Sequence, residues 1–229
     1  MKKAFVLLIL ITLFYSCKRT PIKNSLFIEN LFGDVKEMTE YSYNTYIDSN
    51  NAYSKGALNF KTIYRFDEKG FLTEWIEYNA NGGMEWKAIP TKDNSGMQTG
   101  IIAYKSNSVL SWKAAYVYDN NGNKSEETDY DAMGNIESKI TFKYDKNNKK
   151  SERIIFSPSG AISSKSVFIN NEKGNEIGNE YYDANGTLKA KCTIQYFELD
   201  KINNWHKQIQ LLEGRPALII EREIEYYSK

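Results

Sequence analysis

Residues 116–123 read Tyr-Val-Tyr-Asp-Asn-Asn-Gly-Asn, and the core of this sequence returns along the chain. Each copy has an aromatic residue, then Asp or Asn, two variable residues and Gly, as in residues 66–70, 130–134 and 182–186. An Asp at the first turn position accepts hydrogen bonds from the turn's own backbone, and Gly at the last takes a positive φ at no steric cost. This pattern is typical of a hairpin built on a type I turn followed by a left-handed residue. We therefore expect structural turn roles for Asp67, Gly70, Asp119, Gly122, Asp131, Gly134, Asp183 and Gly186.

These glycines belong to a ladder that runs through most of the chain. Its steps alternate between 14 and 12 residues, which makes a 26-residue unit of two strands. Asn148 tolerates the positive φ of its position, whereas Ser108 fits it least well. A fixed period predicts a series of equivalent structural units. The rungs are Gly56, Gly70, Gly82, Gly96, Ser108, Gly122, Gly134, Asn148, Gly160, Gly174 and Gly186.

The segments between the turns alternate in polarity. Counted from each turn's last residue, even positions are mainly apolar and odd positions polar, as residues 136–144 illustrate. This alternation predicts strands with one covered face and one wet face. We therefore predict an all-β fold, a meandering antiparallel single-layer sheet of about 14 strands over residues 34–229, curved or partly closed. A curved open sheet is the first expectation and a closed or nearly closed barrel the second.

Two regions depart from the ladder. Residues 24–31 predict one short helix that ends before Gly33. Residues 200–204 read as a longer turn, and residues 213–216 close the last hairpin. The repeat domain therefore keeps its alternation but loses its register towards the C-terminal end.

The N-terminal residues carry a targeting signal. Lys2 and Lys3 precede an apolar run over residues 4–15, which is too short to span a bilayer. The run ends at Ser16-Cys17, which resembles the lipobox of bacterial lipoproteins. That resemblance implies lipid attachment at Cys17, with the alternative being ordinary secretory cleavage beside an incidental cysteine. We expect a signal peptide at 1–17, a linker with the short helix at 18–33, and a cell-envelope location on a membrane face left open.

Charge narrows the range of partners. The formal net charge is +1, and removing Lys2 and Lys3 takes it to −1, so nothing favours nucleic acid. A membrane-spanning barrel is not expected either, because Lys124, Glu126, Ser138 and Glu152 interrupt the apolar stripes. We expect no cofactor and no bound metal.

The aromatic-x-Tyr-Asp-x-x-Gly-Asn core at 116–123, with echoes at 64–71 and 142–149, resembles the YD or RHS repeat. The resemblance covers roughly residues 60–195, and residues 31–37 look like the start of RHS-like lipoproteins of Bacteroidetes-type bacteria. It implies a spiralling single-layer β-sheet, as in RHS proteins that enclose a toxin. Some 14 strands are too few to wrap a cargo, and the 26-residue unit is longer than the usual repeat. MORN-type hairpin arrays are a neighbouring possibility.

Residues with catalytic potential are few. His206 stands beside Trp205 in an irregular hairpin, without the serine motif that a catalytic triad needs, so we expect a surface or rim residue. One histidine and the single free Cys192 do not make a zinc site, and Cys192 reads as a small buried hydrophobe. Carboxylate pairs are available for a hydrolase, for example Glu74 with Glu77 or Glu126 with Glu127.

Aromatic residues give the best binding hint. Trp86 and Trp112 fall on even positions and read as core, whereas Trp75 falls on an odd position with Phe71 and Thr73. Exposed aromatics on a rigid sheet stack on sugar rings or anchor a protein partner. The alternative is that a neighbouring segment covers this face. Trp75 and Phe71 are therefore the possible ligand-binding residues.

The expected function is that of a non-catalytic envelope lipoprotein that acts as a protein-interaction or structural module. Its expected partners are an unknown protein or glycan, and the membrane through the lipid. A carbohydrate-binding surface and a hydrolase are alternatives. An immunity or antitoxin role rests only on analogy with the RHS and MORN neighbourhood.

Overall fold

The computed structural model describes residues 23–28, 30–49, 52–94 and 96–228, which form one short helix and fourteen strands. The signal segment and Cys17 lie outside the described residues. In chain order the elements are α1 (Ser25–Ile28), β1 (Val35–Ile47), β2 (Tyr53–Phe66), β3 (Leu72–Asn79), β4 (Met84–Lys92), β5 (Gln98–Lys105), β6 (Leu110–Tyr118), β7 (Lys124–Asp131), β8 (Ile136–Tyr144), β9 (Lys150–Phe156), β10 (Ile162–Asn170), β11 (Glu176–Asp183), β12 (Leu188–Leu199), β13 (Trp205–Leu212) and β14 (Arg215–Tyr226).

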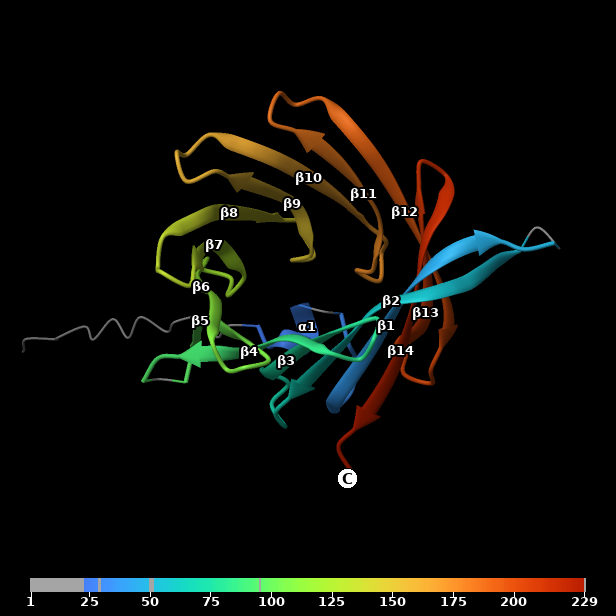
Figure 1. The fold of residues 1–229 in the computed structure, drawn as a ribbon, viewed down its shortest axis with the longest axis horizontal. Coiled ribbons are helices and arrows are strands. Elements are labelled where there is room, and N and C mark those ends of the chain that lie inside the picture. The colour runs from blue at the N-terminus through green and yellow to red at the C-terminus, as the bar shows by residue number, and fades with distance from the viewer. Residues whose placement is uncertain (1–22, 29, 50–51, 95, 229) are drawn as a thin grey trace, which may run out of the picture.

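The sheet closes on itself. Each strand pairs antiparallel with the next, and β14 pairs with β1 to complete a barrel (Figure 1). The closing register aligns Glu40 with Arg222 and Ser42 with Ile220. The prediction of a fourteen-strand, meandering antiparallel sheet is confirmed, and its single layer covers one face by turning it inward. No helix among the described residues is long and apolar enough to cross a membrane.

The hairpin turns share one geometry, seen clearly at residues 119–123. The amide of Asp119 donates to the carbonyl of Asn123 at 2.8 Å, and Gly122 donates back to Asp119 at 3.0 Å. The Asp119 carboxylate accepts the amides of residues 121 and 123, as the turn chemistry predicts. Gly122 has φ +76°, and Asn148 and Ser108 take the same conformation at +60° and +62°.

The first expected rung, Gly56, is not a turn. It lies within β2, and a Cβ there would stand 3.1 Å from the carbonyl oxygen of Asn44. Strands β1 and β2 instead meet at Asp48 and Ala52, where the amide of Asp48 donates to the carbonyl of Ala52 at 3.0 Å. The 14-residue spacing to Gly70 is therefore coincidental at this end. As a result β1 and β2 are long strands of 13 and 14 residues, and their tip projects beyond the ring (Figure 1).

Residues 200–204 were expected to form a longer turn, which is wrong. Asp200 and Asn204 make the same backbone hydrogen bond as in the other turns, at 2.9 Å, and Asn203 takes the left-handed position at φ +71°. The extra length belongs to β12, where Glu198 also has a positive φ of +57°. This irregular strand, and not the turn, displaces the ladder.

Successive turns fall at opposite ends of the barrel, so the alternating ladder defines two mouths. Residues 23–34, the plug segment, cross one mouth, and Figure 1 shows α1 inside the ring of strands. We call this end the plugged mouth and the other the open mouth. The turns at the plugged mouth are 67–71, 93–97, 119–123, 145–149, 171–175 and 200–204.

Hydrogen bonds and a small core fix the plug segment. Leu26 donates its amide to the carbonyl of Gly70 at 3.2 Å. The buried Asn204 side chain accepts the amide of Phe32 and donates to the carbonyl of the same residue, both at 2.8 Å. The plug thus ends up tied to turns far apart in the chain. Its apolar cluster consists of Leu26, Leu31, Val35, Met38 and Phe66.

The packing of the plug identifies the inner face of the sheet. Met38 and Phe66 contact the plug, so side chains of their parity point into the barrel. The opposite, outer face carries solvent-exposed ion pairs with N–O distances of 2.6–2.8 Å. Such pairs contribute little stability, but they make the outside of the barrel a charged surface suited to water. Examples are Lys36–Glu225, Lys55–Glu221, Lys139–Glu126, Lys143–Glu152 and Lys191–Glu180.

Candidate functional site

A bulge changes the face on which Trp75 lies. Thr73 is an extra residue after the turn of β2 and β3, so the alternation of sides shifts by one beyond it. Trp75 therefore aligns with Tyr64 on the inner face. The expectation that Trp75 lies on the wet face is wrong, because parity counted from Gly70 does not include the bulge.

Phe71, the other residue expected to bind a ligand, stays in the turn. It is half-buried, and the Nζ of Lys92 lies 5.9 Å from the centre of its ring. Trp75 points into the barrel, whereas Phe71 lies at its end beside an outer lysine. The structure therefore does not bring the two residues into one site.

Aromatic rings form a row across the inner face of β2 to β6. Trp75 stacks on Tyr64 with ring centroids 5.8 Å apart, meets the edge of Trp86 at 4.5 Å, and Trp86 meets Trp112 at 5.8 Å. The rings pack on the buried cluster of Ala88, Ile101, Ala103 and Ala114. Trp86 and Trp112 thus have the core positions expected of them. The indole Nε1 of Trp75 is buried without a hydrogen-bond partner.

Carboxylates continue this row on β7. Glu127 forms an ion pair with Lys124, and Asp129 accepts the hydroxyl of Ser138 at 2.6 Å. Burial raises the pKa of Asp129 above its usual range, and the neighbouring Glu127 acts in the same direction, while the Ser138 bond opposes it. This side of the interior is therefore acidic and aromatic.

The two carboxylate pairs named for a hydrolase are each divided between the faces of the sheet. Glu74 is ion-paired on the outer face, whereas burial raises the pKa of Glu77, which aligns with Trp86 inside. Glu126 is likewise paired outside, and its neighbour Glu127 points inward. Neither pair flanks a common substrate position.

A cavity of about 280 Å³ lies inside the barrel beneath the plug segment, along β9 to β14. Its volume is near the lower limit for ligand sites, roughly 300 Å³. Amides, charged groups and two aromatic rings line it, and Asn30 of the plug segment contributes to it. The principal lining residues are Lys149, Lys150, Asn170, Glu176, Asn179, Tyr196, Trp205, Gln208, Gln210 and Arg222.

Arg222 is the most deeply buried cation in this cavity. Its side chain is 8% exposed, its Nε donates to Glu40 Oε1 at 2.7 Å, and its guanidinium lies 3.5 Å from the ring centre of Trp205. Its Nη1 is buried with no hydrogen-bond partner. A buried donor without an acceptor is destabilising, so such groups in native proteins call for an explanation.

Glu176 lines the same cavity and is its buried carboxylate. Burial raises its pKa, which the Asn179 amide at 2.8 Å and the positive charges of Lys150 and Arg153 partly offset. The Tyr196 hydroxyl donates to the backbone carbonyl of Glu176 at 2.6 Å, and burial raises the pKa of that phenol to about 12. These bonds hold the donors and acceptors of the cavity in fixed positions.

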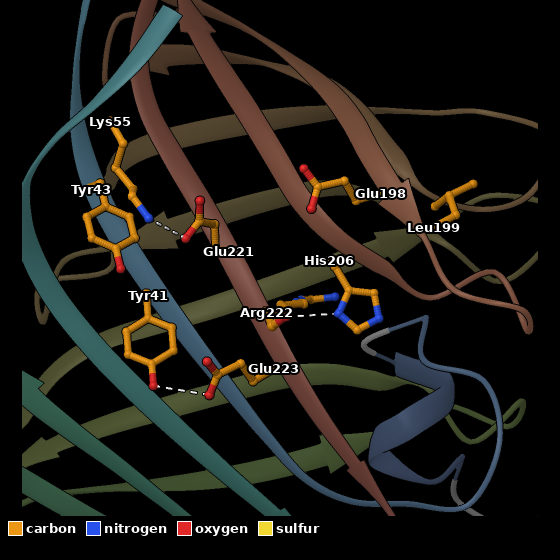
Figure 2. A pocket seen from close by; sticks show the side chains of 9 residues that line it. All are labelled: Tyr41, Tyr43, Lys55, Glu198, Leu199, His206, Glu221, Arg222 and Glu223. Carbon is orange, nitrogen blue, oxygen red and sulfur yellow. Dashed lines mark hydrogen bonds and ion pairs between the residues drawn. The ribbon is translucent and has the colours of Figure 1, made fainter.

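A depression of about 630 Å³ lies on the outer face of β1, β13 and β14, and Figure 2 shows its side chains. Its charged groups are bonded to one another, for example Lys55 to Glu221 at 2.8 Å. His206, on its rim, has its Nδ1 3.0 Å from the carbonyl oxygen of Arg222. The depression lies on the outer surface of the barrel, whereas the cavity lies inside it.

Metal and thiol chemistry find little support among the described residues. No group of three or more His, Cys, Asp and Glu side chains there is arranged to hold a metal ion. Cys192 is half-buried on the inner face opposite Asn179, and burial raises the pKa of its thiol. A thiol with a raised pKa is a poor nucleophile at neutral pH.

Sequence reasoning missed Arg222, Glu176 and Lys150, although a signal for two of them was present. At the plugged mouth the second residue after the left-handed turn position is Leu72, Gln98, Lys124, Lys150 and Glu176 in the ladder, and Trp205 after the last turn. At the open mouth it is Met84, Leu110, Ile136, Ile162 and Leu188. Polar residues on an inward parity mark a wet interior. Arg222 lies outside the ladder, so no equivalent position in another repeat could have indicated it.

The fold and the cavity define a closed antiparallel barrel with a charged exterior and a small polar site inside. No family model and no curated protein sequence matches the chain. It is similar in structure to a porin-like protein from Bacteroides uniformis, at 10% identity and TM-score 0.51 over 91% of this chain and 100% of that one.

Two other solved structures are more distant. A putative outer membrane lipoprotein-sorting protein domain from Vibrio parahaemolyticus has 9% identity and TM-score 0.38, covering 85% of this chain and 87% of that one. A DUF1329 family protein from Desulfovibrio piger has 11% identity and TM-score 0.35, covering 84% and 86%. The likeness to the porin-like protein is one of fold.

Proposed function

We propose that this protein is a non-catalytic, lipid-anchored protein of the cell envelope that binds a ligand inside its barrel. The observation that carries the proposal is a cavity of about 280 Å³ inside the barrel, lined by amides and by the charged side chains of Lys150, Glu176 and Arg222. Polar groups gathered in one concave site favour a ligand that pairs with them. The RHS-type resemblance remains a proposal about the repeat unit alone.

The non-catalytic part of the proposal rests on how the reactive groups are engaged. Glu127 is ion-paired with Lys124, Asp129 accepts a bond from Ser138, and His206 contacts a backbone carbonyl. Acid–base catalysis requires groups held towards a substrate. A hydrolase remains the weaker alternative on this account.

The envelope location rests on the signal segment and Cys17, together with the water-facing exterior. The porin-like description of the similar fold is in keeping with this location. Cys17 precedes Lys23, in the plug segment, by six residues, which span at most roughly 20 Å. A lipid on Cys17 would therefore hold the plugged mouth near the membrane and turn the open mouth away from it.

A second candidate function is protein binding at the open mouth. Ile136, Ile162 and Leu188 are 48%, 46% and 43% exposed there, on equivalent positions of successive repeats. With Met84 and Leu110 they form an apolar rim, which we call the open collar. Exposed apolar side chains that recur around one end of the barrel favour a protein partner.

Native mass spectrometry of the detergent-extracted protein tests the first proposal. We expect a small molecule to accompany the wild type and the outer-face control Lys139→Gln. The double variant Glu40→Gln/Arg222→Gln, which removes both members of the buried pair, should lose it. A ligand-free wild type that instead retains a protein partner, lost on Ile136→Ser, would favour the second candidate.

A further inference from the structure

The interior around the cavity carries more cationic than anionic groups. Lys149, Lys150 and Arg222 line the cavity, and Arg222 is already bonded to Glu40. Among the described lining residues Glu176 is the one carboxylate. Three cationic side chains against one lining carboxylate favour an anionic ligand.

The remaining polar groups are mainly amides. Asn179 already donates to Glu176 and Asn170 to the carbonyl of Lys150, which orients both side chains. Gln208, 6% exposed, and Gln210 complete this set along β13. An amide offers both donors and an acceptor, and so does each hydroxyl of a sugar.

Apolar surface is scarce in this cavity. Among the described residues that line it, Ile194 is the single aliphatic side chain. Trp205 has the Arg222 guanidinium over its ring and Tyr196 at 5.5 Å, so it supports the cation. An acyl chain would find few contacts and would leave the amides without partners.

We propose that the cavity binds a monosaccharide-sized, hydroxyl-rich molecule with one anionic group, a sugar acid or a sugar phosphate. The anionic group accepts from Arg222, and the hydroxyls pair with Asn179, Gln208 and Gln210. This proposal rests on the proposed function, ligand binding inside the barrel. The size is set by the cavity of about 280 Å³, which accommodates one ring and little more.

Isothermal titration of the detergent-solubilised protein with glucuronate, glucose 6-phosphate, glucose and inorganic phosphate tests the proposal. We expect at least one charged sugar to bind about tenfold or more tightly than both glucose and phosphate, because a charge-assisted bond adds to the hydroxyl contacts. The two charged sugars distinguish a carboxylate from a phosphate. Glu40→Gln/Arg222→Gln should lose that preference, and Lys139→Gln should keep it.

Three outcomes would overturn the proposal. If glucose bound as tightly as the charged sugars, the ligand would need no anionic group. If phosphate bound as tightly as the charged sugars, the cavity would be an anion site that does not recognise a sugar. Binding of none of the four would reject the ligand class. In that last case a different co-purifying molecule would leave barrel binding intact, whereas a ligand-free wild type would end both proposals.

A folding control accompanies the titration. Thermal unfolding shows whether the double variant is folded. If the double variant is not folded, Gln208→Leu replaces it. This change removes an amide that would pair with a hydroxyl of the ligand, and it alters no charge. Loss of charged-sugar affinity by tenfold in a folded Gln208→Leu protein supports the proposal, and unchanged affinity contradicts it.

Discussion

The two mouths of the barrel are built from the same turn and differ in the second residue of the strand after it. At the plugged mouth this residue is polar or charged in Gln98, Lys124, Lys150 and Glu176, while Leu72 contacts the plug cluster. At the open mouth every equivalent residue is aliphatic or Met. The turn chemistry is shared, but the faces differ. Lys124 aligns with Tyr118 and pairs with the inward Glu127. By contrast, Ile136 aligns with Tyr130 on the outer face.

The largest expected effect comes from untying the plug. Asn204→Ala removes a buried side chain that bonds both backbone groups of Phe32 and the Tyr226 hydroxyl. We expect a loss of about 3 kcal/mol in the free energy of unfolding, or about 6–12 °C in Tm. Asn185→Ala, at an exposed open-mouth turn, is the control and should change Tm little. Equal effects of the two would mean that the plug adds no stability.

Substitutions at two turn glycines distinguish the cost of backbone strain in the turn from the cost of a clash with the plug segment. Gly70 and Gly134 have φ of +78° and +91°, so Ala at either is strained by about 1–2 kcal/mol. A Cβ at Gly70 would also lie 2.8 Å from Leu26 Cδ1, whereas Gly134 has open space. We expect Gly70→Ala to be more destabilising by about 1–3 kcal/mol in urea unfolding. Similar midpoints for both variants would contradict the close fit of Leu26.

Lowering the pH should change the contributions of Glu176 and Glu180, on the two faces of β11, to the free energy of unfolding in opposite directions. Burial raises the pKa of Glu176 above its unfolded value, so its charged form opposes folding at neutral pH and this penalty fades as the pH falls. Glu176→Gln should therefore be more stable than wild type at pH 7, with the difference shrinking towards pH 4. On the outer face the Lys191 bond lowers the pKa of Glu180, so Glu180→Gln should lose stability at pH 7. The measurement is the free energy of unfolding of each variant across this pH range. If both variants were stabilised, or both destabilised, relative to wild type at pH 7, the placement of Glu176 and Glu180 would be contradicted.

The smallest effect on stability is expected at the open collar. Ile162→Ser changes a side chain that is 46% exposed, so the free energy of unfolding should move by about 0.5 kcal/mol or less. Self-association, measured by sedimentation velocity, should decrease or stay absent. A large destabilisation would mean that the collar belongs to the core.

The strands, their turns and the 26-residue unit could be predicted because each depends on local chemistry, such as Asp119 with Gly122. Closure was expected only second to an open curved sheet, and its register could not be predicted, since it aligns Glu40 with Arg222 across most of the chain. The face of Trp75 was missed because the bulge at Thr73 leaves no mark in the composition. The cavity was missed because its lining combines side chains of six successive strands, β9 to β14, with Asn30 of the plug segment, which lies far away in the chain.

Closure also governs the order in which the fold can be completed. Hairpins from β2 onward can form as each emerges, but the free edge of β1 waits for β14, the last strand of the chain. The seam is finished by Tyr227, whose amide donates to the carbonyl of Asp34 at 2.8 Å. Because the two ends of the domain meet there, a circular permutant that joins them and opens at the Gly134 turn retains thirteen of the fourteen strand pairings as local ones. In such a permutant the present seam becomes a local connection, and the final step of folding moves to β7 and β8.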